Sequence, residues 1–543
     1  MCGIWCCLSK NECPDPSPLI NKLVARGPEG TRIEKINPHV TFGFTRLAIN
    51  GLSESGMQPF TKGAITWICN GEIYNAKELE KDLGLSNTGS DCECIGGLYL
   101  RYRDDLKTFA RCLDGVFAIA VFDSERNQLI VTRDPYGVRP MFISKNYSHI
   151  TFASEMKALS NISTSKVSPL KPGTLEVYNV ATMELLKTIQ YHTIPWVRNP
   201  TLSNVKDASM AIRSALEKSV EKRLLTERPI AALLSGGLDS SLIASLLQRM
   251  LTERKLPPLK TFSIGFQGSS DLAHARIVAD WIKSDHTEIT MTPDEFFNAI
   301  PELIEAIESY DTTTVRASTG NYLIAKKIRE LTDCKVVFNG DGSDELFGGY
   351  LYFNNAPGDQ EFHSETERLL ENIHTFDVLR SDRSISANGL EARTPFLDKQ
   401  FVALVRSIDP SMLRPIRASG DDHEGRIEKY ILRCAFDDGV TLPAQVLWRR
   451  KEAFSDGVSS PEKAWFQEIQ DRVKAKVPSD WPSDETFSSH LCPRTPEEYY
   501  YRSLFTNIFS RSVEKATVPY RWMPKWSPET NDPSARTLRV YNA

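Results

Sequence analysis

The sequence predicts two domains of different class: an α+β domain with helices packed on sheets, then an α/β domain built on a parallel sheet. Three observations support this prediction. About the first 180 residues are rich in short β-branched and aromatic runs separated by turn residues. A stretch of Pro, Asn, Ser and Thr then interrupts the pattern at residues 194–207. Beyond it, strands alternate with Gly turns and helices.

Length and composition agree with this organisation and narrow the function. A chain of 543 residues is too long for one hydrophobic core. The chain has 65 Lys and Arg against 70 Asp and Glu, so it has no excess of positive charge that would attract nucleic acid. No apolar run reaches the roughly 18 to 20 residues of a membrane span, and the start lacks the layout of a signal peptide. The 11 cysteines are scattered, as is typical of reduced thiols. We expect a cytoplasmic protein with small-molecule substrates and no nucleic-acid or membrane partner.

The elements of the first domain follow from hydrophobic periodicity. Helical spacing predicts helices at residues 76–84 and 94–113, and alternation predicts strands at residues 40–49, 64–74, 116–123, 129–134 and 174–180. Cys6 and Cys7 are expected in a further buried strand. The alternative is a zinc site shared with Cys2 and Cys13, but paired C-x2-C spacing is missing.

The second domain begins with a strand, a Gly turn and a helix in residues 229–251. A strand follows at residues 259–266 and a helix at residues 275–284, and residues 334–350 again place a Gly-rich turn behind a strand. Repeated units of this kind predict a parallel sheet with ligands at the carboxyl ends of its strands. The tail from about Pro519 is Pro-rich, and its pattern predicts no role.

Cys2 directly follows the initiator Met1. Cys is small enough for Met1 to be removed, which leaves a thiol and a free α-amine on one residue. That amine titrates at roughly 7.7 to 8.0 and can accept the thiol proton. The turn at Asn70 and Gly71 offers N–H donors for an oxyanion, and Arg46 can clamp a carboxylate. The alternatives are a buried Cys, a hairpin turn and a surface Arg.

The turn at residues 235–241, SGGLDSS, lies between a strand and a helix. The backbone N–H groups of Ser235, Gly236 and Gly237 can converge on a phosphate at the helix N-terminus. The turn lacks the Lys of the Walker A pattern. Asp239 supplies a carboxylate where Mg²⁺ bridging to phosphates can be held. The alternative is a tight turn capped by Ser residues.

A second turn, NGDGSDE at residues 339–345, places three carboxylates beside two glycines. Such a cluster is unfavourable unless a cation neutralises it. Alone it predicts a solvated surface loop. Beside a phosphate-binding turn on a neighbouring strand, it favours a Mg-nucleotide site.

Together the motifs resemble a known family. The first domain resembles the class II glutamine amidotransferases, which have a layered αββα N-terminal-nucleophile fold, through MCGI (1–4), RGP (26–28), RLAI (46–49), NGEIYN (70–75) and RDPYGVRP (133–140). The second resembles the ATP pyrophosphatase synthetase domain through SGGLDSS, FSIG (262–265) and GDGSDE (340–345). Their order on one chain, with LEARTPFLD (390–398) and DPSARTL (532–538), resembles the glutamine-hydrolysing asparagine synthetases.

The resemblance implies a ligase with two reactions. L-glutamine is hydrolysed through a thioester on Cys2, and the ammonia passes inside the protein to the second domain. There L-aspartate is adenylated by Mg-ATP, and ammonia displaces AMP to give L-asparagine, with pyrophosphate and glutamate as the other products. It also implies a glutaminase domain at residues 2–190, a synthetase domain at 205–520 and a C-terminal tail at 521–543. A homodimer is left open.

The resemblance also assigns site residues. Arg46 and Asp91 hold the carboxylate and amino group of glutamine with help from Glu72, beside Asn70 and Gly71, and the pocket wall is formed by Leu47, Ala48, Ile49 and Asn50. The nucleotide is bound by Leu234, Ser235, Gly236, Gly237, Asp239, Ser240, Ile264, Asn339 and Gly340. Asp239 and Asp344 are the Mg²⁺ ligands. Aspartate and phosphate contacts are assigned to Thr313, Thr314, Arg316 and Lys429.

One position departs from the family pattern. The family has Glu in the third position of the second turn, in S-G-E-G-S-D-E, whereas this chain has Asp341 preceded by Asn339 in place of Ser. That Glu is linked to adenylate formation and to removing a proton from ammonium. Asp341 keeps the charge but loses one methylene of reach, so the catalytic efficiency is open.

Two rival functions are weighed. A non-catalytic or regulatory homologue of the same fold is opposed by intact Cys2, Arg46, Asp91, Asp239 and Asp344. Another amide-forming ligase, such as a β-lactam synthetase-like cyclase, is opposed by the N-terminal nucleophile, which those relatives characteristically lack.

Overall fold

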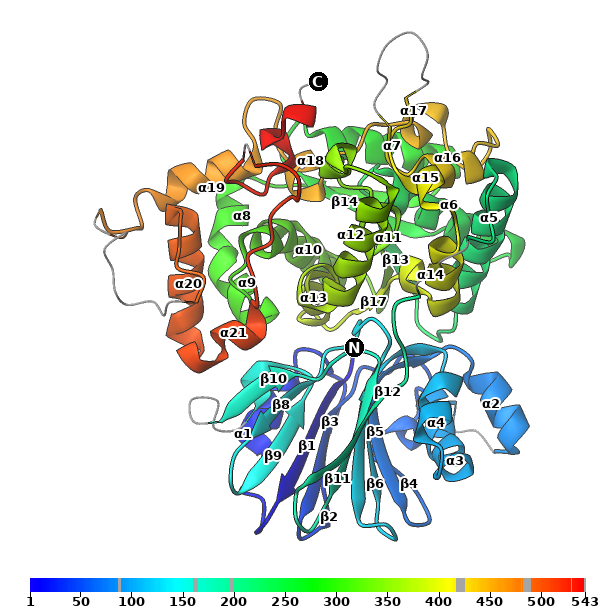
Figure 1. The fold of residues 1–543 in the computed structure, drawn as a ribbon, viewed down its shortest axis with the longest axis vertical. Helices are drawn as coiled ribbons and strands as arrows, with labels where there is room; N and C mark the ends of the chain where they lie inside the picture. Colours follow the sequence, from blue (N-terminus) through cyan, green and yellow to red (C-terminus); the bar gives the residue numbers. More distant parts are fainter. Residues whose placement is uncertain are drawn as a thin grey trace.

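The computed structural model describes residues 1–85, 89–159, 165–195, 200–416, 425–479, 481, 490–528 and 530–541. It has a β-rich half and a helix-rich half, with the N-terminus at the boundary between them (Figure 1). The expected linker at residues 194–207 joins the halves, and its residues 196–199 lie outside the described chain.

Two six-stranded sheets form the first half. The first has the order β10-β8-β9-β1-β3-β2, with β10 Lys166–Pro169, β8 Phe142–Lys145, β9 His149–Ala153, β1 Gly3–Ser9, β3 Val40–Thr45 and β2 Thr31–Asn37. The second has the order β12-β11-β7-β6-β5-β4, with β12 Leu185–Gln190, β11 Thr174–Asn179, β7 Gln128–Arg133, β6 Gly115–Asp123, β5 Ile65–Ile73 and β4 Phe60–Lys62.

The core of this half lies between the two sheets. Ile4, Cys6 and Leu8 of β1 pack with Ile68 of β5 and Ala118 of β6. Because successive side chains of a strand point to opposite faces, Cys7 packs on the other side of β1. Both cysteines are buried in β1, as predicted.

Helices cover the outer faces of the two sheets unequally. The second sheet packs against α2 Ala76–Leu83, α3 Cys94–Arg101 and α4 Leu106–Cys112. Over the first sheet the helical layer is only α1 Ser17–Ile20 with the adjoining turn, and the second half covers the rest. The predicted helix at 94–113 is thus two helices, because the Asp105 carboxylate caps a new helix by accepting from Thr108 N.

The second half contains a five-stranded parallel sheet, as predicted. Its order is β15-β14-β13-β16-β17, with β15 Asp285–Thr290, β14 Lys260–Gly265, β13 Ile230–Leu233, β16 Val336–Phe338 and β17 Glu391–Arg393. β13 pairs with β14 on one side and with β16 on the other, so the strand order reverses there. The two Gly-rich turns follow β13 and β16, at the point where open α/β sheets bind ligands.

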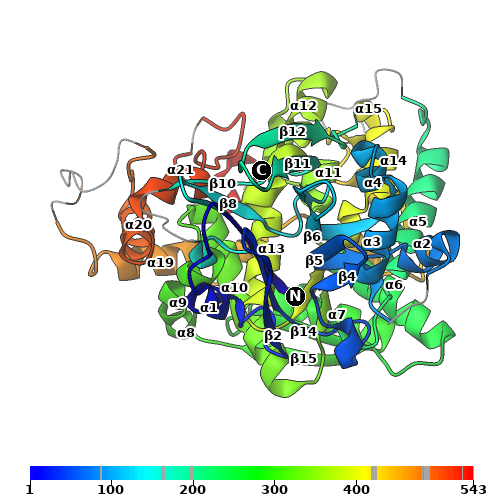
Figure 2. The same ribbon diagram turned by 90° about the horizontal axis from the view of Figure 1, so that it is seen from below.

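Helices surround this sheet: α5 Val205–Lys222, α6 Leu238–Glu253, α7 Ser270–Ile282, α8 Pro293–Asn298, α9 Ile300–Ile307, α10 Thr312–Leu331, α11 Ser343–Phe347, α12 Asp359–Asn372, α13 Asp377–Ser386, α14 Lys399–Arg406, α15 Pro410–Leu413, α16 Tyr430–Ala435, α17 Ala444–Leu447, α18 Phe454–Gly457, α19 Trp465–Val473, α20 Pro496–Ile508 and α21 Glu514–Thr517. Seen from below, the sheets of the first half lie against α13 and its neighbours (Figure 2).

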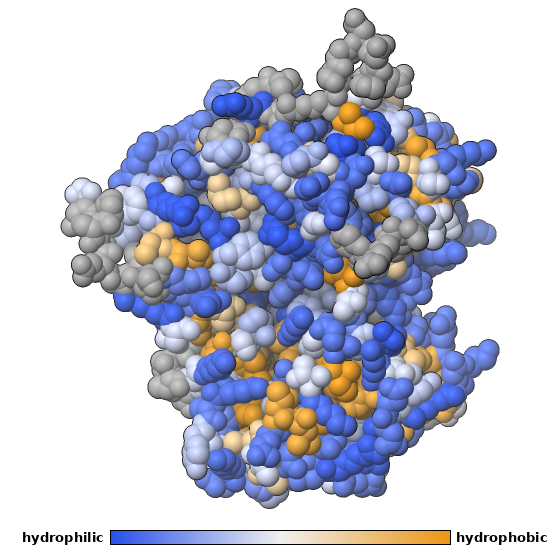
Figure 3. All heavy atoms as spheres, viewed as in Figure 1, coloured by the Kyte–Doolittle hydropathy of each residue, from blue (hydrophilic) through white to orange (hydrophobic). Residues whose placement is uncertain are grey.

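The surface is mostly hydrophilic on the face shown in Figure 3, with apolar side chains gathered over the lower, N-terminal half. Leu185 and Leu186 of the edge strand β12 are 45% and 44% exposed. Within the described residues, no helix is both long enough and apolar enough to cross a bilayer.

Candidate active sites

The first candidate site surrounds Cys2, just before β1. The Cys2 thiol lies 3.4 Å from the backbone N of Leu47 and 3.5 Å from its O, so it faces the segment that follows β3. Burial raises the pKa of this thiol to about 11, although the nearby N-terminal ammonium opposes the rise. A thiol with this pKa is almost entirely protonated at neutral pH, so it needs a base to become a nucleophile.

Met1 is present in the structure and is only 1% exposed. Its ammonium group donates to the backbone O of Leu390, 3.2 Å away in the second half. Burial lowers the pKa of this amine to about 5. The first residue of the chain therefore lies inside the boundary between the two halves.

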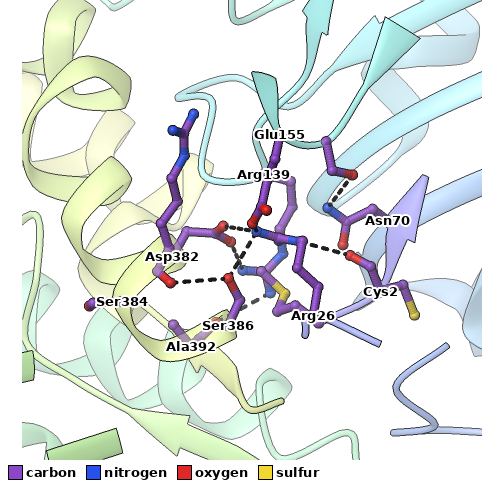
Figure 4. A network of polar contacts seen from close by, with 12 residues as sticks. Cys2, Arg26, Asn70, Arg139, Glu155, Asp382, Ser384, Ser386 and Ala392 are labelled. Atoms are coloured by element: carbon purple, nitrogen blue, oxygen red, sulfur yellow. Dashed lines mark hydrogen bonds and ion pairs between the residues drawn. The ribbon is translucent and has the colours of Figure 1, made fainter. Parts of the chain in front are cut away.

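Asn70 and Gly71 lie on β5, and Figure 4 shows Asn70 close to Cys2. Asn70 is fully buried and donates to the Ser154 hydroxyl at 3.4 Å, while its Oδ1 has no hydrogen-bond partner. A side chain at Gly71 would place its Cβ 2.2 Å from the backbone O of Val116, so only Gly fits against β6. Asn70, one of the two expected oxyanion donors, is thus close to Cys2.

The predicted wall residues Leu47, Ala48, Ile49 and Asn50 form the segment after β3. The predicted strand at 40–49 ends at Thr45, which frees these residues to line the site. Arg46 donates to the backbone O of Ser53 at 2.9 Å and to that of Gly51, so it also holds the loop beyond the wall.

Two buried carboxylates complete this site. Glu72 accepts from Asn50 Nδ2 at 2.8 Å, and Asp91 accepts from the backbone N of Ile73 at 2.7 Å. Burial raises the pKa of Asp91 to about 6, and burial together with the Asp91 charge raises that of Glu72. Arg393 of β17 lies 3.3 Å from Glu72. A buried acidic pair of this kind favours a cationic ligand such as an α-ammonium group.

The second candidate site is a pocket at the carboxyl ends of β13, β14 and β16. Its wall includes these predicted residues: Leu234, Ser235, Gly237, Asp239, Ser240, Ile264, Thr313, Thr314, Asn339, Gly340, Asp341, Asp344 and Lys429. Gly236 does not line it. Gly236 has a φ of +69°, and a Cβ there would lie 2.4 Å from His274, so it shapes the turn instead.

The two predicted metal ligands lie close together and are bridged by a lysine. Lys429 Nζ is 2.5 Å from Asp239 Oδ2 and 2.6 Å from Asp344 Oδ1. Lys451 Nζ is 2.6 Å from the other oxygen of Asp344. Burial alone would raise the pKa of Asp344, but these two ammonium groups hold it below its ordinary value.

Both carboxylates therefore reach one cationic atom, which is the arrangement a Mg²⁺ shared with phosphates requires. In the part of the chain that the structure describes, no group of three or more Asp, Glu, His or Cys side chains converges as a metal site. Mg²⁺ usually keeps several waters and is bound through one or two carboxylates plus substrate phosphates, so the pair fits that ion.

Asp341 lies in the same pocket. Its Oδ2 is buried without a hydrogen-bond partner, and Arg380 of α13 is 3.7 Å from the other oxygen. Burial raises the pKa of this carboxyl, while Arg380 opposes the rise. Asn339 donates to the Ser381 hydroxyl at 2.6 Å, so α13 supports the turn.

Comparisons with known proteins match both halves of the chain. A family model described as asparagine synthase matches residues 211–358 and 354–530, and one described as glutamine amidotransferase domain matches residues 1–214. The asparagine synthetase [glutamine-hydrolyzing] of Gallus gallus is 41% identical over 572 residues, covering 100% of this chain and 99% of that protein. Those of Bos taurus and Homo sapiens are each 39% identical with the same coverage.

The chain belongs to the family of glutamine-hydrolysing asparagine synthetases.

Besides Gly236, one further residue assigned from the family pattern does not line the synthetase pocket. Arg316 begins α10 with Thr313 and Thr314, but it does not line the cavity. Its guanidinium pairs with Glu497 of α20 and with Asp532 near the C-terminus. Arg316 is 4% exposed, and four of its N–H groups donate to Glu497 and Asp532, so its guanidinium is held by these carboxylates and not by the pocket.

Other pocket residues of this asparagine synthetase family member escaped the sequence analysis. Lys451 and Glu452 line the pocket from the loop before α18, and Arg380 and Asp377 enter from α13. The basic run WRRKEAF at residues 448–454 was the available signal for the loop. For α13 no local signal exists, because its position depends on the fold.

The glutaminase and synthetase sites are joined by a buried ionic network (Figure 4). Arg26 donates to Cys2 O at 3.1 Å and pairs with Glu155 and with Asp382 of α13, each at 2.9 Å. Arg139 reaches the second oxygen of Asp382 at 3.3 Å. The backbone of the nucleophile is thus linked through one arginine to the helix that supports the second site.

Proposed function

We propose that this protein makes L-asparagine from L-aspartate, using ammonia released from L-glutamine and ATP that is converted to AMP and pyrophosphate. One observation carries the proposal. The chain is related over its whole length to such synthetases, and it has the Cys2 thiol 3.4 Å from the backbone N of Leu47 in one half and a pocket lined by Asp239, Asp344 and Lys429 in the other, which supports the proposal. The presence of both sets of reactive groups argues against a merely regulatory role.

In the glutaminase half, the thiol of Cys2 attacks the amide carbon of glutamine. Removal of Met1 gives Cys2 its own α-amine, which takes the thiol proton. The side-chain N–H of Asn70 and the backbone N–H of Gly71 then donate to the oxyanion. Asp91 and Glu72 attract the substrate ammonium, and Arg46 attracts its carboxylate.

In the synthetase half, the turn at residues 235–240 cradles phosphates at the N-terminus of α6. Asp239 and Asp344 would hold Mg²⁺, which neutralises the negative charge that develops on the phosphates. Lys429 and Lys451 are then free to leave these carboxylates and donate to phosphate oxygens. Asp341, whose Oδ2 has no hydrogen-bond partner among the described residues, accepts a proton from ammonium, which leaves ammonia free to attack the adenylate carbonyl and displace AMP.

Two substitutions test the division of labour. Cys2→Ala should abolish glutamine-dependent synthesis while synthesis from added ammonium persists. Asp239→Asn should suppress synthesis from either nitrogen source by about 10²- to 10³-fold, since it removes charge stabilisation of several kcal/mol. Glutamine hydrolysis should continue in the Asp239→Asn protein.

The assay counts asparagine, glutamate and AMP in the same reaction. If wild-type protein with glutamine, aspartate and Mg-ATP released no AMP or no asparagine, the proposed function would be wrong. If Cys2→Ala abolished synthesis from both glutamine and ammonium, the assignment of two separate sites would be wrong, although the overall reaction could still be the proposed one.

The proposal also covers the domain bounds, the oligomeric state, the location in the cell and the removal of Met1. We propose a glutaminase unit at residues 2–190, a synthetase unit at 205–520 and a C-terminal tail at 521–543. A homodimer in solution is checked by light scattering during gel filtration, and cytoplasmic residence by fractionation of cells that produce the protein. Mass spectrometry of the mature N-terminus checks Met1 removal.

A further inference from the structure

The C-terminal segment, residues 519–541, crosses the synthetase half from α21 to the neighbourhood of α18 (Figure 1, red). The sequence pattern gave this segment no role. In the structure its polar side chains reach buried partners on elements that form the synthetase pocket. Two anchors hold it.

The first anchor is Arg316 of α10. Its Nη1 and Nη2 lie 2.7 and 2.9 Å from the two oxygens of Asp532, and Gln470 donates to the same carboxylate at 3.0 Å. On its other side Arg316 pairs with Glu497 at 2.6 Å. A fork-to-fork pair of a buried Arg is geometrically specific, so it fixes where the segment lies.

The second anchor lies two to four residues further along. Ser534 Oγ donates to Asp456 Oδ1 at 2.9 Å. Arg536 Nη2 donates to Glu452 Oε1 at 3.0 Å and to the backbone O of Asp456 at 2.9 Å. Asp456 is 1% exposed, so its bond with Ser534 is shielded from water, while the Arg536 bonds are partly buried.

The loop that receives the second anchor is a wall of the pocket. Residues 449–455 line the cavity, and Lys451 in that loop holds Asp344 at 2.6 Å. Residues 449–453 form neither helix nor strand, so side-chain bonds determine where they lie. Glu452 is the junction, because it accepts from Arg536 on one side and from Ser270 Oγ at 2.7 Å on the other.

We propose that Arg536 and Asp532 are positioning residues for the synthetase reaction. The C-terminal segment acts as a strap that holds the loop at residues 449–456, and with it Lys451, against the nucleotide site. This inference rests on the proposed function for its catalytic consequence, but the contacts it describes are independent of the substrate.

The experiment compares full-length wild type with Arg536→Gln, Arg536→Lys and Asp532→Asn. The control is Arg276→Gln, which removes an exposed ion pair with Glu288 on the far side of α7. Hydrogen exchange reports the opening of residues 449–456, and steady-state assays with ammonium report the KM for ATP and kcat. Glutamine hydrolysis is measured alongside.

We expect Arg536→Gln and Asp532→Asn to speed exchange in residues 449–456 by about tenfold. The same variants should raise the KM for ATP by roughly three- to tenfold and leave glutamine hydrolysis within twofold of wild type. Arg536→Lys keeps the charge and should recover most of both effects. Arg276→Gln should change neither the exchange in residues 449–456 nor the KM for ATP.

Unchanged exchange in residues 449–456 in the Arg536→Gln protein would overturn the strap. An equal loss of glutamine hydrolysis would also overturn it, because it would indicate general misfolding. If wild type made no asparagine while Arg536→Gln still loosened the loop, the strap would stand and the proposed function would fall.

Discussion

At the scale of single residues, the carboxyl group of Asp91 predicts how the KM for glutamine depends on pH. Burial raises its pKa to about 6, above the ordinary value of 3.8. As the pH falls through 6 the carboxylate gains a proton and loses its attraction for the ammonium of glutamine. We expect the KM for glutamine to rise toward tenfold per pH unit below 6. Steady-state kinetics between pH 5 and 8 measure this.

Asp91→Asn supplies the matched control for that prediction. Its KM for glutamine should be high at every pH and should lack the step near 6. Synthesis from added ammonium is the internal reference. A wild-type KM that stays flat from pH 5 to 7 would assign the substrate ammonium to another group.

At the second site, we expect the rate of synthesis to depend on the length of the side chain at position 341. The Oδ2 of Asp341 is buried and Arg380 lies 3.7 Å from its Oδ1, so a longer acid has little room. We expect Asp341→Glu to slow synthesis from ammonium and Asp341→Ala to nearly eliminate it. Rates of AMP release measure both. A faster Asp341→Glu protein would mean that the site has not adjusted to the shorter acid.

At the scale of elements, the pairing of β5 with β6 fixes the oxyanion donors. Gly71 lies opposite Phe117, and any Cβ would meet the β6 backbone at 2.2 Å. Gly71→Ala should therefore push the strands apart, lower the free energy of unfolding by about 1–3 kcal/mol and abolish glutamine hydrolysis. Urea unfolding and the glutaminase assay measure these losses.

The control is Gly30→Ala, where the nearest atom to a new Cβ is a flexible methionine methyl 3.6 Å away. It should remain near wild type in both measurements. Ammonium-dependent synthesis should persist in both proteins. Normal glutamine hydrolysis by Gly71→Ala would contradict the placement of the donors.

The elements themselves were largely predictable because their signals are local. β5, β6, β7, β11 and β14 agree with the strands predicted from alternation, and α2 agrees with its predicted helix. β1 and part of β3 were also predicted, whereas β4, β8, β9 and β10 were missed, as were the edge strands β2 and β12. Their exposed residues weaken the alternation on which the prediction depends.

At the scale of the whole molecule, Asp382 neutralises two arginines at the boundary between the halves. Arg26, Arg139 and Asp382 are all essentially buried. Asp382→Asn leaves both guanidinium groups short of a counter-charge, so we expect the free energy of unfolding to fall by about 3–5 kcal/mol. The urea midpoint measures this.

Asp294→Asn is the matched control, because Asp294 is 78% exposed in its pair with Arg472. Its effect should stay below about 1 kcal/mol. Equal midpoints for the two variants would show that the boundary network contributes no net stability.

Long-range contacts explain why part of the candidate site escaped prediction. Asp239 and Asp344 belong to recognisable Gly-rich motifs, so the neighbouring residues predict that they are site residues. Arg316 also lies in a segment that matches the family pattern. Its partner Asp532, however, is 216 positions further along the chain, and this ion pair holds the guanidinium outside the pocket. Lys451 enters through a loop whose place is set by tertiary contacts. The residues around Arg316 do not encode this outcome, and the basic run around Lys451 indicates the loop but not its position.

The buried position of Met1 imposes an order of events during synthesis. Its amine ends against the backbone O of Leu390, which leaves the ribosome long after the first residue does. At about 5–20 residues per second, translation keeps the chain start open to an aminopeptidase for roughly 20–80 s before that partner exists. Under the proposed mechanism, an aminopeptidase therefore has its readiest access to Met1 before this contact forms. A molecule that folds untrimmed would be sealed in that form until its halves separate.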